Sequence, residues 1–153
     1  MKFLYWKRDR IALVVFAAFY VFFGVVMILK QEAVIYHPNT QDFENCLGFA
    51  SAQKITFEGT RMYLQESAKD TQTLKIAVLY HGNAWSACDR AFMAPIFVNA
   101  GYALLVPEYA GYSNDTVSPS HDAIKRDVEH VVAYLQTKEY GEILVAGESI
   151  GTG

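Results

Sequence analysis

The sequence has little cysteine and little proline, and beyond residue 30 it has little positive charge. Two cysteines and four prolines in 153 residues exclude a disulfide scaffold and a proline-rich or fibrous chain. Residues 31–153 carry eight basic and fifteen acidic side chains, a net charge of −7. A protein that binds nucleic acid would present a basic face, so we expect no nucleic-acid partner.

The sequence also lacks the patterns that hold common cofactors. Cys46 and Cys88 do not have the CxxC spacing of a zinc site, and no dinucleotide fingerprint is present. The stretch Gly147–Gly153 is rich in glycine but lacks the lysine of a phosphate-binding P-loop. We therefore expect no cofactor and no metal. The two cysteines fit either a pair of buried free thiols, the interpretation that we favour, or one disulfide if the domain lies outside the cytoplasm.

One long apolar run is present near the N-terminus. Residues Ile11–Leu29 read IALVVFAAFYVFFGVVMIL, nineteen residues without a charge. As a helix this run would be ~28 Å long, close to the hydrocarbon thickness of a bilayer. A buried core helix would show a polar stripe and a cleavable signal peptide would end in small residues, and the run shows neither. We predict an uncleaved transmembrane anchor, so that the lipid bilayer is a partner of the protein.

Basic residues flank this run on its N-terminal side. Four of the first ten residues are Lys or Arg, whereas only Lys30 follows the run closely. The positive-inside bias then keeps the N-terminus in the cytoplasm and places the rest of the chain on the extracytoplasmic side. The predicted parts are a basic flank at 1–10, an anchor at 11–29, a juxtamembrane segment at 30–52 and a domain at 53–153.

The rest of the chain alternates strand-like and helix-like segments. Three compact apolar runs, Lys75–Tyr80, Tyr102–Val106 and Glu142–Ala146, do not alternate polar and apolar residues, which is typical of parallel strands buried on both faces. Between them lie a helix predicted at Asp89–Asn99 and a longer helix predicted to begin after Ser118 as its N-cap. The order strand, helix, strand, helix, strand indicates an α/β fold with right-handed crossovers.

The most informative stretch is Gly147–Gly153, GESIGTG, directly after the third apolar run. Its Gly147-x-Ser149-x-Gly151 spacing is that of a nucleophile elbow, in which the serine lies on a sharp strand-to-helix turn. Side chains two residues before and after the serine would collide, so glycine is needed at both positions. We predict Ser149 to be a nucleophile and Gly147 and Gly151 to be the elbow glycines.

A second candidate element, His81-Gly82-Asn83, follows the first apolar run. An acyl-transfer enzyme needs N–H donors directed at the developing oxyanion. In the elbow architecture one donor is the backbone N–H after the nucleophile, here Ile150, and the other comes from the loop after the third strand, here Asn83 or Ala84. Gly82 allows this loop to approach closely. We interpret His81 as structural, because the triad order in this fold is serine, acid, histidine.

Other polar patterns have structural interpretations. Two short β-like runs within residues 53–65 predict a hairpin. Asp127 and the other acidic residues of the second helix are predicted to form an exposed charged face. Tyr109 and Tyr112 are expected to pack beneath the site, and Glu148, at the variable position of the elbow, is expected at the edge of a pocket.

Four stretches, taken in order, resemble the α/β-hydrolases, and more closely the membrane-anchored Bem46-like serine hydrolases. They are Ile35–Pro38 (IYHP), Leu79–Ala84 (LYHGNA), Pro107–Ser113 (PEYAGYS) and Gly147–Gly153 (GESIGTG). The third stretch departs from the family, which usually has Asp where this chain has Glu108 and often Arg where it has Ala110. The resemblance implies an incomplete α/β-hydrolase fold, a mostly parallel sheet with helices on both faces, preceded by one transmembrane helix. It also implies hydrolysis of an ester, thioester or amide in a small-molecule or acyl substrate.

The resemblance further places the catalytic acid and histidine after the elbow, whereas the sequence reaches only Gly153. We therefore expect an N-terminal fragment of a serine hydrolase, inactive alone, in which a further strand would pair beside Glu142–Ala146. The alternative is a truncated or degenerate hydrolase-fold membrane protein without catalysis. The reading frame beyond Gly153 distinguishes the two.

Overall fold

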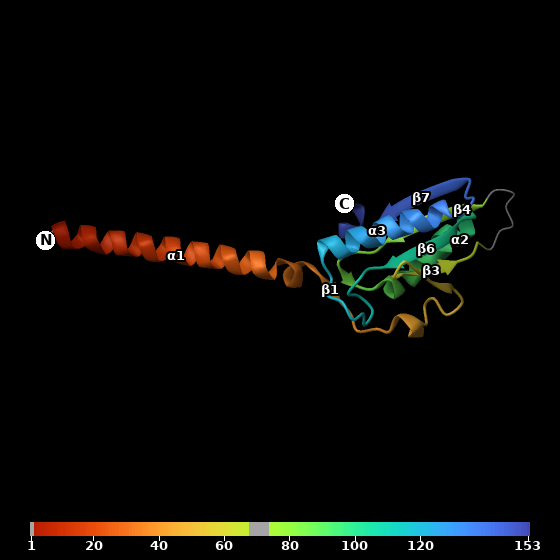
Figure 1. Ribbon diagram of the computed structural model, residues 1–153, viewed down its shortest axis with the longest axis horizontal. Coiled ribbons are helices and arrows are strands. Elements are labelled where there is room, and N and C mark those ends of the chain that lie inside the picture. The colour runs from red at the N-terminus through yellow and green to blue at the C-terminus, as the bar shows by residue number, and fades with distance from the viewer. Residues whose placement is uncertain (1, 68–73) are drawn as a thin grey trace. The chain divides into compact units, whose positions relative to one another are not determined.

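The computed structural model describes residues 2–67 and 74–153, which form two compact units, Met1–Ile35 and Tyr36–Gly153. The first unit is a single helix, α1 (Lys2–Ile35) (Figure 1). Its segment Asp9–Ile35 is long and apolar enough to cross a membrane. The helix extends past the predicted span 11–29 at both ends, so residues 30–35 of the predicted juxtamembrane segment are helical.

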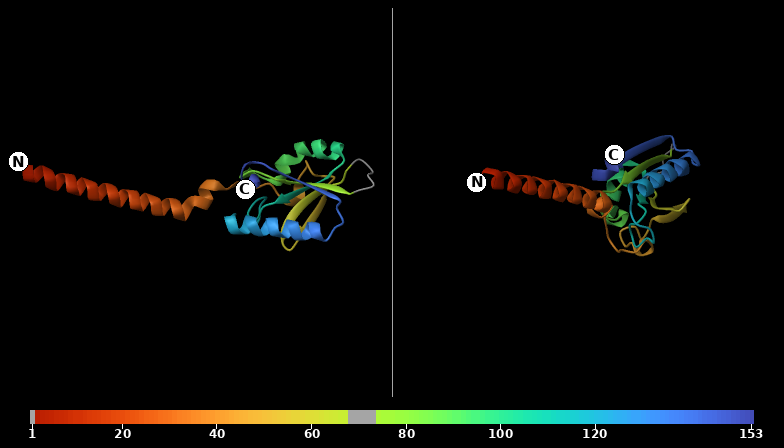
Figure 2. Two further views of the ribbon diagram at one scale, coloured as in Figure 1. Left: turned by 90° about the horizontal axis from the view of Figure 1, so that it is seen from above. Right: turned by 60° about the vertical axis from the view of Figure 1, so that its left-hand side comes forward.

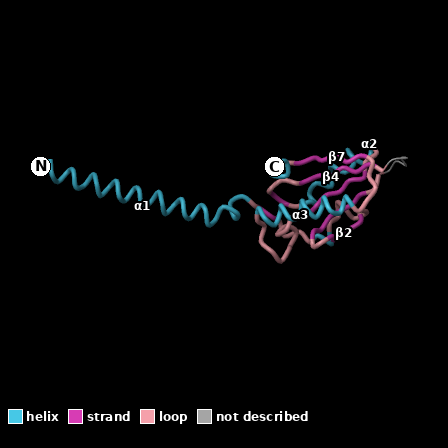
Figure 3. Tube along the Cα trace, turned by 45° about the horizontal axis from the view of Figure 1, so that its top comes forward, coloured by secondary structure: helices cyan, strands magenta, loops and turns pink. Residues whose placement is uncertain are grey.

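The second unit is built on a five-stranded sheet in the order β2-β3-β6-β4-β7 (Figure 3). β2 and β3 form an antiparallel hairpin, and β3 pairs antiparallel with β6. β4 pairs parallel with both β6 and β7. The predicted hairpin and the three predicted parallel strands are confirmed, with boundaries that differ by at most two residues. The strands are β2 (Gln53–Phe57), β3 (Thr60–Gln65), β4 (Lys75–Tyr80), β6 (Ala103–Glu108) and β7 (Glu142–Gly147).

Helices cover both faces of this sheet, as expected. α2 (Ala94–Ala100) lies on one face and α3 (His121–Gln136) on the other (Figure 2). Along β4, Leu79 belongs to the core on the α2 side and Val78 to the core on the α3 side. Because successive side chains of a strand point to opposite faces, a strand covered on both sides must be apolar throughout. This explains the unbroken apolar runs of β4 and β6.

The first predicted helix is divided in two. The segment expected as one helix at Asp89–Asn99 is a 3-10 helix, η2 (Ala87–Met93), followed by α2. Pro95 lies in the first turn of α2, where a residue needs no N–H for the helix ladder. The proline therefore begins α2, and the predicted single helix is interrupted just before it.

The predicted N-cap of the second helix is also wrong. α3 begins after Ser120, whose side-chain oxygen accepts a hydrogen bond from the N–H of Ala123 at 3.2 Å. Ser118 and Pro119 precede the helix in a segment packed on Gly111, where an added Cβ would lie 2.2 Å from the Pro119 nitrogen. This close packing on the preceding turn shifts the start of α3 by two residues.

The expectation that Asp127 lies on an exposed face of α3 is wrong as well. Asp127 is buried because α3 packs against the start of β3. Its carboxylate accepts hydrogen bonds from the Thr60 hydroxyl and the Ala110 N–H, both at 2.7 Å. Burial raises the pKa of Asp127 above its ordinary value. The residue joins α3, the hairpin and the loop after β6.

A disulfide joins the segment before β2 to η2. Cys46 and Cys88 are bonded, with their Cα atoms 5.7 Å apart. The favoured interpretation as two free thiols is therefore wrong. Phe43, at the start of η1 (Phe43–Asn45), and Phe49 both stack on Tyr63 of β3. This aromatic packing brings the segment onto the sheet and places Cys46 beside η2.

Candidate active site

The turn after β7 has the conformation expected of a nucleophile elbow. Ser149 begins a short 3-10 helix, η3 (Ser149–Thr152), with a φ of +53°. Non-glycine residues rarely adopt this left-handed backbone, which is strained. The N–H of Glu148 donates to the carbonyl of Tyr80 at 3.0 Å, so the turn is held on the end of β4.

The two glycines of the turn lie against backbone atoms. A Cβ at Gly147 would be 2.1 Å from the Gly151 carbonyl oxygen, and one at Gly151 would be 2.5 Å from the Tyr80 carbonyl oxygen. Backbone atoms inside a folded sheet cannot move aside as a flexible side chain can. Any other residue at either position would distort the turn that carries Ser149.

The loop after β4 lies next to this turn, because β4 and β7 are neighbours and Tyr80 is in register with Gly147. A Cβ at Gly82 would be 3.1 Å from a carboxylate oxygen of Glu148. The loop continues into β5 (Ala84–Trp85), which pairs parallel with β1 (His37–Pro38). The structure thus brings together the two elements that sequence analysis singled out.

His81 and Glu108 form a buried pair beneath the loop. Both side chains are fully buried, and His81 Nε2 lies 3.2 Å from Glu108 Oε1. His81 Nδ1 lies 2.8 Å from the carbonyl oxygen of Gly82. Glu108 also accepts hydrogen bonds from the Ala87 N–H at 3.2 Å and the Ser113 hydroxyl at 2.5 Å. His81 Nδ1 therefore has a backbone hydrogen-bond partner, whereas Nε2 lies close to the Glu108 carboxylate without a hydrogen bond to any of the described residues.

Sequence analysis missed the role of Glu108, although one signal was available. Glu108 ends a strand that is otherwise apolar, and a carboxylate in such a strand must be buried with partners. The partners themselves come from three other segments, which no local pattern connects.

Ile150, the residue after Ser149, packs against the core on the α3 side. This packing fixes the peptide between Ser149 and Ile150 at the start of η3. The N–H of that peptide is one of the two predicted oxyanion donors. Asn83, the other predicted donor, belongs to the loop after β4.

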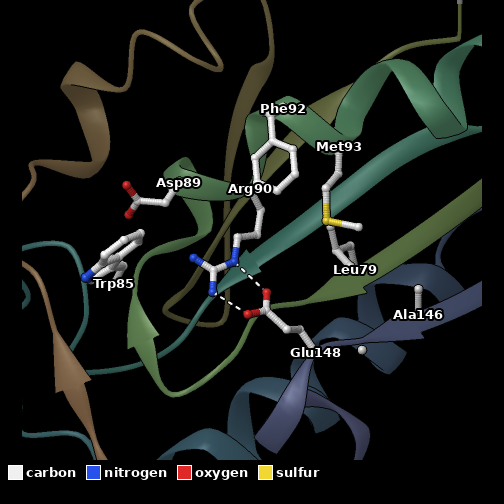
Figure 4. A pocket seen from close by; sticks show the side chains of 9 residues that line it. Leu79, Trp85, Asp89, Arg90, Phe92, Met93, Ala146 and Glu148 are labelled. Carbon is white, nitrogen blue, oxygen red and sulfur yellow. Dashed lines mark hydrogen bonds and ion pairs between the residues drawn. The ribbon is translucent and has the colours of Figure 1, made fainter.

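A cavity of about 530 Å³ lies beside the elbow (Figure 4). Its polar feature is an ion pair in which Arg90 Nε and Nη2 donate to the two carboxylate oxygens of Glu148 at 2.7 and 2.8 Å. These hydrogen bonds hold the pKa of Glu148 below its ordinary value. Arg90 is buried, and no sequence pattern marked it as a partner of Glu148. The cavity is lined by Leu79, Trp85, Asp89, Arg90, Phe92, Met93, Ala146, Gly147 and Glu148.

No metal site is present in the described part of the chain, where no three His, Cys, Asp or Glu side chains gather in a suitable group.

Comparison with solved structures identifies the fold. Est1E from Butyrivibrio proteoclasticus, bound to ferulic acid, is similar with a TM-score of 0.54 and 18% identity over 65% of this chain and 43% of that chain. The chain has part of the α/β-hydrolase fold. An α/β-hydrolase from Vibrio vulnificus gives a TM-score of 0.52 and 20% identity over 71% of this chain and 39% of that chain.

A third similar structure is the propionate-bound esterase Est2 from the Planctomycetes species Thermogutta terrifontis. Its TM-score is 0.52 and its identity 15%, over 67% of this chain and 43% of that chain. The chain therefore spans about two fifths of the length of these structures. Comparison with family models and with curated proteins found no match.

Proposed function

We propose that this chain is part of a membrane-anchored serine hydrolase of the Bem46-like kind, with Ser149 as its nucleophile. The observation that carries the proposal is the strained turn at Ser149, enclosed by two glycines that lie against backbone atoms. Strained backbone of this kind persists where the surrounding structure enforces it, and it is concentrated at functional sites. In open α/β sheets the carboxyl ends of parallel strands are also where ligands bind.

The proposed reaction is hydrolysis of an ester, thioester or amide. The Ser149 hydroxyl oxygen attacks the substrate carbonyl carbon, and the backbone N–H groups of Ile150 and Asn83 stabilise the resulting oxyanion. Collapse of this intermediate breaks the bond to the leaving group and forms an acyl-enzyme, which water then hydrolyses. The proposal assigns neither the general base nor the acid that orients it to a residue of this chain.

The apolar cavity beside the elbow supports a substrate with an uncharged apolar portion. Its single cation, Arg90, is already held by both carboxylate oxygens of Glu148. A substrate carboxylate would therefore find no unpaired positive charge among the side chains that line this cavity. We propose a small-molecule or acyl substrate of low polarity.

We propose that α1 anchors the protein with its N-terminus in the cytoplasm and the Tyr36–Gly153 unit on the extracytoplasmic side. Two independent features support this orientation. Basic residues precede the apolar segment, in accord with the positive-inside bias. The Cys46–Cys88 disulfide is of a kind that persists in oxidising compartments outside the cytoplasm.

The nucleophile is tested with a fluorophosphonate probe on the full-length protein in membranes. We expect labelling of the wild type and its loss in Ser149→Ala, whereas Ser51→Ala, which removes an exposed hydroxyl elsewhere in the unit, keeps it. Labelling that survives Ser149→Ala would refute the assignment. A wild type without labelling favours a catalytically inactive hydrolase-fold membrane protein.

The anchor is tested by washing membranes with alkaline carbonate and by adding protease from the extracytoplasmic side. We expect the full-length protein to stay in the pellet and the segment after residue 35 to be degraded. Release into the supernatant, as for a cleaved signal sequence, contradicts the anchor, and protection from the protease contradicts the orientation.

A further inference from the structure

Three successive carbonyl groups in the loop after β4 are each bound to a buried partner. The carbonyl of His81 accepts a hydrogen bond from the Tyr109 hydroxyl at 2.9 Å. The carbonyl of Gly82 lies 2.8 Å from the Nδ1 of His81. The carbonyl of Asn83 accepts from the Tyr112 hydroxyl at 2.8 Å.

The Asn83 carbonyl has a second donor from another part of the chain. The N–H of His37 in β1 donates to it at 2.9 Å. A carbonyl oxygen has two lone pairs, and these two donors use both. The orientation of this peptide is therefore set from two sides.

Because the peptide group is planar, a contact that fixes the direction of a carbonyl also fixes the direction of the N–H in the same peptide. In a planar trans peptide the C=O and N–H of one unit point in opposite directions. The carbonyls of residues 81–83 belong to the peptides whose N–H groups are those of residues 82–84. Fixing the three carbonyls toward the interior therefore fixes the three N–H groups in the opposite direction. Asn83, the proposed oxyanion donor, is the middle one.

The two tyrosines are well placed to remain donors. Both are buried and contact the His81 ring, with ring centroids 4.1 Å away for Tyr109 and 5.1 Å for Tyr112. Burial raises the pKa of Tyr112 to about 12 and raises that of Tyr109 further. Both hydroxyl groups therefore keep their protons at physiological pH.

The segment that carries the tyrosines is itself held at several points. Arg61 donates to the carbonyls of Tyr112 at 2.6 Å and of Ser113 at 3.2 Å. The buried Asp127 accepts from the N–H of Ala110 at 2.7 Å. The loop after β6 is thus a rigid support on which the loop after β4 rests.

We propose that Tyr109 and Tyr112 are positioning residues. Their hydroxyl groups hold the His81 and Asn83 carbonyls, which belong to the peptides on either side of the one that carries the Asn83 N–H. With both flanking peptides held and the Gly82 carbonyl beside His81 Nδ1, the Asn83 N–H is directed toward the substrate oxyanion. This inference rests on the proposed function of Ser149. The Pro107–Ser113 stretch (PEYAGYS) would then have a role beyond packing. Neither tyrosine touches the substrate.

The test compares Tyr109→Phe, Tyr112→Phe and the double variant with Tyr63→Phe in the full-length protein. Tyr63 is a matched control because it is equally buried and its hydroxyl donates to a backbone carbonyl, that of Phe43, at 2.6 Å. Loss of the Tyr63 hydroxyl removes the same kind of hydrogen bond and leaves the loop after β4 unchanged.

The first readout is the kinetics of fluorophosphonate labelling. Since loss of a complete oxyanion donor costs 10²–10³ in rate, we expect a misdirected donor to lower the maximal labelling rate about tenfold in each single variant and more in the double variant. The probe concentration that gives the half-maximal labelling rate should stay unchanged, because the N–H donor acts in the transition state. Tyr63→Phe should label like the wild type.

The second readout does not depend on catalysis. The chain has two tryptophans, so Trp6→Phe leaves Trp85, next to Ala84 in β5, as the only tryptophan, which is excited at a wavelength that tyrosine does not absorb. We expect the double tyrosine variant to show a faster decay of Trp85 fluorescence anisotropy than Tyr63→Phe in this background, because the loop has lost two of its restraints.

The outcomes separate the two proposals. If the double variant matches Tyr63→Phe in anisotropy or in maximal labelling rate, the positioning role is refuted. If the wild type is not labelled at all, the proposed function of Ser149 fails. If the Trp85 anisotropy decay of the double variant then also equals that of Tyr63→Phe, the proposal that the two tyrosines hold the loop after β4 is refuted as well.

Discussion

The loop after β4 and the turn after β7 both contribute to the candidate site, but the fold supports them differently. The loop follows a strand that is buried between two neighbours, and its carbonyls have interior partners. The turn follows a strand that pairs with β4 at the end of the described sheet. Ile143, Leu144 and Val145 of β7 are 48%, 42% and 64% exposed.

This difference indicates which interactions hold the loop after β4 and which hold the turn after β7. The loop after β4 depends on buried polar contacts from several segments, so it is sensitive to changes far from it in sequence. The elbow depends on local steric constraint, which the two glycines and the end of β4 provide. Comparable substitutions near the loop after β4 and near the turn after β7 should therefore lower the free energy of unfolding by different amounts.

The largest contrast is expected between two glutamates. Glu108→Ala removes a buried carboxylate and leaves His81, the Ala87 N–H and the Ser113 hydroxyl without it, which should cost about 4 kcal/mol in the free energy of unfolding. Glu148→Ala breaks an ion pair whose carboxylate side is 49% exposed but whose Arg90 side is buried, and should cost less, about 1–2 kcal/mol. Urea titration of both variants measures the difference, and similar midpoints would contradict it.

The glycines give the next contrast. Gly151→Ala places a methyl group against the Tyr80 backbone, and we expect a loss of about 3 kcal/mol. Gly82→Ala places its methyl group 3.1 Å from a movable carboxylate oxygen of Glu148, so the loss should be about 1 kcal/mol or less. Thermal unfolding of the two variants compares them directly. A Gly82→Ala variant as unstable as Gly151→Ala would show that the loop is as tightly constrained as the elbow.

The two strands can be compared at one register position, where Val78 of β4 lies opposite Val145 of β7. Val78 is 1% exposed and Val145 is 64% exposed. We expect Val78→Ala to lower the free energy of unfolding by about 2 kcal/mol and Val145→Ala by less than about 0.5 kcal/mol. Equal losses would mean that the Val145 side chain is covered in the full-length protein.

The smallest expected effect is a pH dependence of the elbow. Hydrogen bonds from Arg90 depress the pKa of Glu148 below its ordinary value of 4.5. The stabilisation is therefore present above pH 4.5 and is lost as pH falls through the folded-state pKa. Exposure limits the amplitude to below about 1 kcal/mol. Melting temperatures of the wild type and Glu148→Gln should therefore converge in acid. A constant gap between pH 3 and pH 7 would contradict the sign of the shift.

The order of the elements was predictable because it rests on local patterns. The apolar runs of β4, β6 and β7 and the turn residues between them are visible without knowledge of the fold. The Ser149 elbow was visible for the same reason, since its glycine spacing is set by the backbone of a single turn.

Features that depend on distant packing were not predictable. The Cys46–Cys88 bond joins residues 42 apart, and it forms because Phe43 and Phe49 stack on Tyr63. The start of α3 was shifted because Pro119 packs on Gly111. The Arg90–Glu148 pair joins residues 58 apart, and neither sequence position indicates the other.

The pairing of β1 with β5 also defines a route for mechanical force. Ile35 ends α1, and His37, two residues later, is already bound to the Asn83 carbonyl. A tension applied to α1 would enter the Tyr36–Gly153 unit through β1. There it loads a parallel two-stranded contact along its length, where the hydrogen bonds resist in shear. The loop after β4 is therefore the first element of this unit that a pull on α1 would load.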